Sequence, residues 1–224
     1  MLSELLQRAD LWRGRHTAPH SRRPVLPTGY APLDQQLPGG GWPVGALTEI
    51  LYPRPGVGEL QLTLPALRQL GESERWLAWV DPPHVPYAPA LAQHGLNLAQ
   101  LLWLHTRTAK EQLWALEQTL RSGICGAVLG WPGSVNDRAL RRLQLAAEHG
   151  EAVAFLFRPR GLADTPSPAA LRLAVERQGD DVMVRLLKTR GQWADGLIRL
   201  PDPAPRPAAS STSFDEARHE TAAP

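Results

Sequence analysis

The chain has 224 residues, a net charge of +2 and 43% hydrophobic residues, which suits one soluble domain with a sizeable core plus appendages. No apolar run approaches the roughly 18–20 residues that cross a bilayer. The N-terminus also lacks the pattern of a signal peptide, so a cytoplasmic location is expected. The single cysteine excludes an internal disulfide, and the histidines lack metal-ligand spacing, so no cofactor is expected.

Residues 1–13 predict a short amphipathic helix, with Leu5 and Trp12 in its apolar stripe. A basic linker follows over 14–26. Two interpretations remain open for the helix: it packs on its own domain, or it docks on a neighbouring subunit or partner.

The central region, 27–200, alternates strand and helix signals. We predict strands over 46–52, 75–80, 101–105, 126–131 and 151–157. Helices are predicted over 60–70, 86–95, 109–123 and 136–150, the first restricted by Pro65 and the last ended by Gly150. This order predicts an α/β fold with a mainly parallel central sheet flanked by helices.

After residue 170 the pattern changes to alternating apolar and polar residues over 171–177, 181–190 and 194–201. That alternation predicts an antiparallel C-terminal extension of the sheet. The remaining residues, 201–224, are rich in Pro, Ala, Ser and Thr, and this composition predicts a disordered tail.

The segment PRPGVGEL (53–60) lies where a phosphate-binding loop would follow the first strand. A working loop reads Gly-x-x-x-x-Gly-Lys-Ser/Thr, in which the Lys contacts phosphates and the hydroxyl holds Mg²⁺. Here Pro53 replaces the first Gly and Gly58 keeps the second, while Glu59 and Leu60 replace the Lys and the hydroxyl. Gly56 is left to offer a backbone amide. A carboxylate at this place would repel a polyphosphate, so no ATP hydrolysis is expected.

The stretch TGYAPLDQQLPGGGWPVGALTEI (28–50) resembles the approach to the ATP site of RecA-type recombinases, and the element order is similar to a RecA-like core. The other ATPase positions also depart from that pattern. Pro83 stands where the resemblance places the catalytic Glu, Gly130 where it places the metal-binding Asp, and Arg158 near the polar sensor. The resemblance therefore implies a RecA-like domain that has lost its enzyme activity.

On these features the chain is identified as a member of the ImuA family of translesion synthesis-associated proteins, which are also described as RecA-like or SulA-like. The resemblance implies a non-catalytic adaptor in damage-inducible error-prone synthesis. Its implied partners are ImuB, a Y-family-like protein, and an error-prone DnaE-type polymerase. A RecA filament and non-specific DNA contact are further implied partners.

Two groups of arginines are candidate DNA- or partner-binding residues. Arg158 and Arg160 follow the strand that leads, in RecA, into a DNA-contacting loop. Arg138, Arg141 and Arg142 lie together on the predicted helix 136–150. The alternative for both groups is an exposed loop or helix face whose arginines are solvated or paired.

A second hypothesis for the function is a SulA-type cell-division inhibitor that binds the tubulin-like division protein. A third is a residual nucleotide-binding switch, in which backbone amides near Gly56 and Gly58 still hold an anion weakly.

Overall fold

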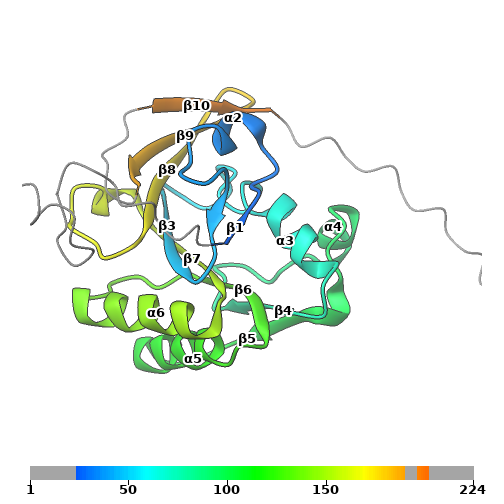
Figure 1. The fold of residues 1–224 in the computed structure, drawn as a ribbon, viewed down its shortest axis with the longest axis vertical. Coiled ribbons are helices and arrows are strands. Elements are labelled where there is room, and N and C mark those ends of the chain that lie inside the picture. Colours follow the sequence, from blue (N-terminus) through cyan, green and yellow to red (C-terminus); the bar gives the residue numbers. More distant parts are fainter. Residues whose placement is uncertain (1–23, 190–195, 202–224) are drawn as a thin grey trace, which may run out of the picture.

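The computed structural model describes residues 24–189 and 196–201 (Figure 1). The predicted N-terminal helix with Leu5 and Trp12, most of the basic linker and nearly all of the predicted tail lie outside these residues. The described chain starts with β1 (Val25–Leu26), which pairs antiparallel with β2 (Trp42–Pro43). Between them lies the short helix α2 (Ala31–Asp34).

The central sheet has eight strands in the order β10-β9-β8-β3-β7-β6-β4-β5. Their bounds are β3 (Ala46–Tyr52), β4 (Trp76–Val80), β5 (Leu101–Leu104), β6 (Cys125–Gly130), β7 (Val153–Pro159), β8 (Leu171–Gln178), β9 (Asp181–Lys188) and β10 (Gly196–Leu200). All strands from β8 to β5 run parallel, and only β9 and β10 run antiparallel to their neighbours.

The predicted α/β fold with a mainly parallel sheet between helices is confirmed. One detail of the C-terminal extension was wrong, because β8 pairs in parallel with β3. The strand therefore continues the parallel sheet, and the antiparallel part begins at the turn that Gly179 forms after it. The alternating apolar and polar residues of β8 suggested a strand with one solvent-exposed face. In the structure, however, the first five residues of β8 are buried, as is usual in a parallel sheet.

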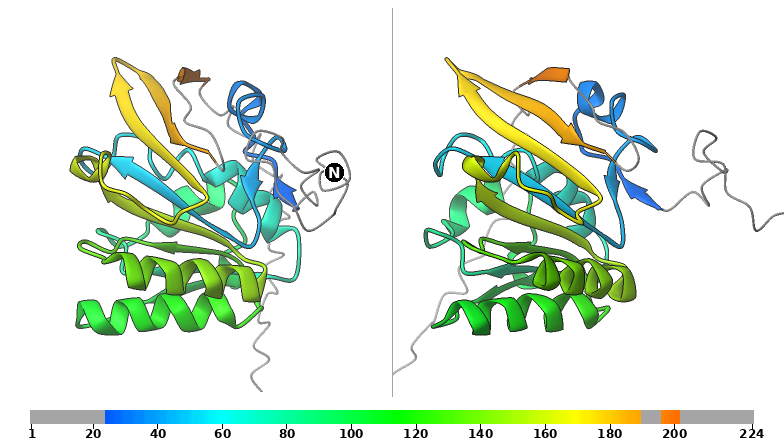
Figure 2. Two further views of the ribbon diagram at one scale, coloured as in Figure 1. Left: turned by 60° about the vertical axis from the view of Figure 1, so that its left-hand side comes forward. Right: turned by 90° about the vertical axis from the view of Figure 1, so that its left-hand side faces the viewer.

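The helices cover both faces of the sheet. They are α3 (Leu64–Gly71), α4 (Ala88–Gln93), α5 (Ala109–Arg121) and α6 (Asp137–Gly150), with 3-10 turns η1 (Leu98–Gln100) and η2 (Arg160–Leu162). Figure 2 shows α5 and α6 side by side on one face, with α2 and α3 on the other. Each face has its own apolar core. Among the described residues, no helix is long and apolar enough to cross a membrane.

Local sequence signals set the helix ends. Thr108 and Asn136 accept hydrogen bonds from the amides of Glu111 and Ala139, and so cap α5 and α6. Pro65 lies in the first turn of α3, where its missing N–H costs nothing, so the helix starts at Leu64 and the residues before it form turns.

The predicted role of Gly150 as the helix stop needs correction. Gly150 is the last residue of α6, and the left-handed position falls on Glu151, with a φ of 50°. A Cβ on Gly150 would lie 1.9 Å from the carbonyl oxygen of Leu120 on α5. Glycine is therefore needed here for the close approach of α6 to α5.

Candidate functional site

The loop after β3 does not present an open phosphate site. Gly56 and Gly58 have φ values of +85° and +103°, which turn the chain tightly between Tyr52 and α3. Within this turn Glu59 folds back on its own loop. Its carboxylate accepts hydrogen bonds from the backbone amides of Gly56 and Val57, at 2.9 and 3.0 Å. The side chain of Leu60 packs against the core beside it.

The carboxyl end of β6 is filled by apolar side chains. Trp131 stacks on Phe157 of β7, with 4.7 Å between ring centroids, and lies 5.9 Å from Trp79 of β4. At the preceding position, a Cβ on Gly130 would come within 2.6 Å of Leu116. A carboxylate side chain at position 130 would therefore have to displace the side chain of Leu116 on α5. No group of residues suited to a metal ion occurs in the described part of the chain.

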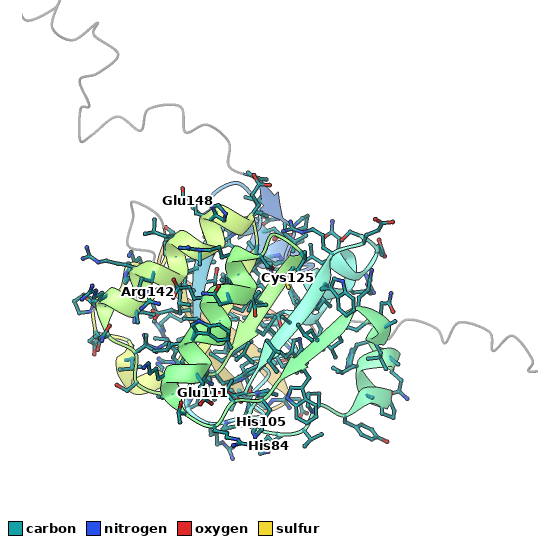
Figure 3. The ribbon with its side chains drawn as sticks, turned by 90° about the horizontal axis from the view of Figure 1, so that it is seen from below. His84, His105, Glu111, Cys125, Arg142 and Glu148 are labelled. Carbon is teal, nitrogen blue, oxygen red and sulfur yellow. The ribbon has the colours of Figure 1, made fainter. Side chains whose placement is uncertain are left out.

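A polar cluster lies at the carboxyl ends of β4 and β5. Asp81 has a φ of 48°, unusual for a residue with a side chain. Its carboxylate accepts hydrogen bonds from the backbone amide and the hydroxyl of Thr106, at 2.7 and 2.5 Å. The Nδ1 of His105 lies 3.3 Å away. Figure 3 labels His105 at this end of the molecule. The Thr106 contacts hold the two loops together, which gives Asp81 a structural role.

Arg158 is in the core, not in an exposed loop as both sequence-based interpretations assumed. It is the sixth residue of β7, and its side chain is 5% exposed. Its Nη1 lies 2.5 Å from Oε1 of Glu49, while Nε of Arg172 lies 2.6 Å from Oε2 of the same carboxylate. Arg172 also donates to the carbonyls of Leu162, Ala163 and Thr165, and so fixes the loop before β8.

The other candidate arginines are at or near the surface, and the structure separates their environments. Arg160 is half-buried and lies 3.6 Å from Glu176 of β8. Arg138 and Arg141 are exposed on α6. Arg142 is exposed too, but its guanidinium pairs with Glu117 of α5, a buried carboxylate. Arg142 therefore joins the two helices, and the three arginines of α6 do not form one free patch.

Sequence reasoning missed four large apolar side chains that are exposed along residues 85–103, a segment that ends in the edge strand β5. Val85 and Tyr87 are 73% and 71% exposed in the loop between β4 and α4. Leu98 of η1 and Trp103 of β5 are exposed as well. The signal was present in the sequence, because residues 82–106 contain no Asp, Glu, Lys or Arg. Large exposed apolar side chains without interspersed charges are typical of binding surfaces. We call these four side chains the uncharged surface.

The family model and the similar proteins found by comparison point to the same family. The model of the family described as cell division inhibitor SulA matches residues 45–154. The chain is 33% identical over 116 residues to the cell division inhibitor SulA of Serratia proteamaculans, covering 52% of this chain and 69% of that protein. It is 34% identical over 121 residues to the protein of the same name from Pectobacterium atrosepticum, covering 54% and 72%.

The chain belongs to the SulA family. The SulA protein of Photorhabdus laumondii is 35% identical over 112 residues, half of this chain and 63% of that protein. The chain thus spans roughly two thirds of the length of its SulA relatives. A crystal structure of SulA from Pseudomonas aeruginosa is 29% identical, with a TM-score of 0.43, and covers 50% of this chain and 97% of that one.

The SulA match overturns the assignment to the ImuA family. The expected role in translesion synthesis was wrong, as were the expected partners: ImuB, a DnaE-type polymerase, a RecA filament and DNA. The resemblance to recombinases rested on residues 28–50, whereas the SulA match begins at residue 45. The two segments share only residues 45–50, which include most of β3. The assignment to the ImuA family therefore rested mainly on the residues before the region that matches SulA.

Proposed function

We propose that the chain inhibits cell division by binding the tubulin-like division protein FtsZ and hindering its assembly. The observation that carries this proposal is the SulA match, which spans β3 through the start of β7. The relatives are named for inhibition of cell division. Induction by DNA damage and action in the cytoplasm, both expected from the sequence, belong to the same proposal.

The uncharged surface is the part of the matched region that we propose contacts the partner. Its four side chains come from the segment that runs from the end of β4 through β5, and all lie within residues 45–154. Interface cores are depleted in charged residues and enriched in aromatic ones. In contrast, Arg158 and Arg160 lie outside the matched region, and Arg158 is buried.

We further propose that the sheet is a RecA-type core without ATPase activity. The lead-in at 28–50, the strand order and the replacement of Lys by Glu59 support this proposal. The packing at Gly130 adds support, because the side chain of Leu116 occupies the space that a metal-binding carboxylate would need. Phosphate release from ATP and Mg²⁺ by the purified chain, measured above a no-protein blank, would contradict it.

The test of the main proposal is assembly of purified FtsZ with GTP, followed by light scattering and by sedimentation. The chain should lower the amount of polymer in proportion to its concentration. The double variant Val85→Ser/Tyr87→Ser should bind FtsZ at least about tenfold more weakly, as loss of central apolar contacts does in other interfaces.

The matched control is Arg138→Ala/Arg141→Ala, which changes two exposed residues on α6 and should inhibit like the parent. Unchanged FtsZ assembly at excess parent protein would reject the proposed function. Full inhibition by the Val85/Tyr87 variant would reject only the surface.

A further inference from the structure

Glu59 is a buried carboxylate whose charge meets backbone amides. The residue is 6% exposed, and each of its carboxylate oxygens accepts one hydrogen bond, from Gly56 and from Val57. Within residues 24–189 and 196–201, it forms no ion pair with a Lys, Arg or His. A buried carboxylate is costly unless its charge is compensated. Here two consecutive N–H donors supply that compensation.

Successive amides that converge on one anion form the concave site by which loops hold phosphate and carboxylate groups. The glycines at 56 and 58 produce this shape through their positive φ values. The loop is also held from behind, since a Cβ on Gly58 would lie 2.6 Å from Val182 of β9. The loop therefore has the geometry of an anion-binding site, and its two amide donors already bind the carboxylate of Glu59.

The phenol of Tyr52 lies close to the Glu59 carboxylate. The pKa of Tyr52 is raised, first by burial and then by the negative charge of Glu59. Tyr52 ends β3, immediately before the loop. The Glu59 carboxylate therefore lies close to the carboxyl end of the central strand β3.

We propose that residues 53–58 form an oxyanion-binding site that the chain fills with its own Glu59 carboxylate. The internal carboxylate occupies the two amides that would otherwise bind an external oxyanion, such as inorganic phosphate, pyrophosphate or the polyphosphate of a nucleotide. Glu59 thus acts as a tethered ligand that closes the site. This goes beyond the absence of ATP hydrolysis, because it assigns the site a ligand and predicts how to open it. It does not depend on FtsZ binding.

The test is a titration of the Glu59→Ala variant with pyrophosphate, followed by the backbone amide NMR signals of Gly56 and Val57. These two signals should shift in the variant and not in the parent. The control, Glu74→Ala, removes an exposed carboxylate of equal charge outside the loop. The Glu59→Ala variant should bind pyrophosphate at least about tenfold more tightly than the control, because charge-assisted bonds to freed amides are strong.

Parallel titrations with inorganic phosphate and with ATP in the absence of Mg²⁺ separate the ligand sources. If ATP binds no better than pyrophosphate, the site recognises only the phosphates. If ATP binds more tightly, the site also contacts the nucleoside. Two results would overturn the proposal: a folded Glu59→Ala variant whose two amide signals ignore all three anions, or a parent protein whose signals shift like those of the variant.

If Glu59→Ala does not fold, Glu59→Gln replaces it in the same titration. Its carboxamide keeps the size of the side chain and one acceptor oxygen but carries no charge, so pyrophosphate should displace it. Failure of a folded Glu59→Gln to bind any of the anions would then overturn the proposal.

Discussion

Glu49 and Arg172 face each other directly across the parallel strands β3 and β8 and form a buried ion pair. They are register partners, and 2.6 Å separate Oε2 of Glu49 from Nε of Arg172. Arg158 from β7 pairs with the other carboxylate oxygen. One carboxylate therefore connects three neighbouring strands, and two buried guanidiniums depend on it.

Replacing Glu49 by Gln should lower the free energy of unfolding by about 3–5 kcal/mol, because it leaves two buried cations without their counter-charge. Urea denaturation followed by circular dichroism measures the change. Arg160→Ala is the comparison, since its contact with Glu176 is partly exposed and 3.6 Å long. That change should cost less than about 1 kcal/mol. Equal effects of the two substitutions would contradict the assigned importance of Glu49.

Arg75 connects the ends of three elements through their carbonyl groups. Its guanidinium donates to the carbonyls of Gly123, Cys125, Gly150 and Glu151, which lie at the end of α5, the start of β6 and the end of α6. Cations are favoured at helix C-termini.

Arg75→Ala should cost about 2 kcal/mol of stability, as the loss of charged hydrogen bonds does. Arg75→Lys should recover only part of this, because an ammonium cannot reproduce the planar fork of the guanidinium. Thermal unfolding of both variants is compared with that of Arg107→Ala, an exposed arginine on a loop. Full rescue by lysine would mean that charge alone, without fork geometry, stabilises this corner.

Cys125 should make the protein less stable at high pH. Burial raises the pKa of its thiol above 9.0, although a hydrogen bond from Ser122 and the charge of Arg75 act in the opposite direction. As the pH passes 9.0, the thiol ionises in the unfolded state while it stays protonated in the folded state. Ionisation therefore stabilises the unfolded state relative to the folded state.

Stability of the parent should therefore fall between pH 9.0 and the folded-state pKa, and Cys125→Ala should lose less over the same interval. Denaturant melts at a series of pH values measure both slopes. Identical slopes for parent and variant would exclude the thiol as the titrating group. A thiol reagent should also react with the parent only as fast as the protein unfolds, since Cys125 is buried.

Gly150→Ala should be destabilising by about 1–3 kcal/mol, as expected for overpacking. The added methyl group would meet the backbone carbonyl of Leu120, which cannot move aside without shifting α5. Gly133→Ala is the matched control, because the corresponding space at position 133 is open. If Gly150→Ala has the same melting temperature as Gly133→Ala, α6 can move away from α5 at little cost in stability.

The sequence predicted those features that depend on neighbours along the chain. The alternation of strands and helices and the effect of Pro65 on α3 are both local, and both appear in the structure. The role of Arg158 was not predictable in this way, because its partner Glu49 is 109 residues distant. Likewise, the loss of the phosphate-binding Lys was visible in the sequence. The hydrogen bonds between the Glu59 carboxylate and its own loop were not, because they depend on the conformations of Gly56 and Gly58.

The exposure of Trp103 has a practical consequence. Its indole is 48% exposed within the uncharged surface, while Trp114 is 63% exposed on α5, outside that surface. Trp42 and Trp79 are buried and shielded from solutes. Among the described tryptophans, Trp103 lies in the proposed interface, whereas Trp114 and Trp76, which is 40% exposed, lie outside it and serve as references. With single Trp→Phe variants, iodide quenching would report whether a bound partner covers the β5 edge without any attached dye.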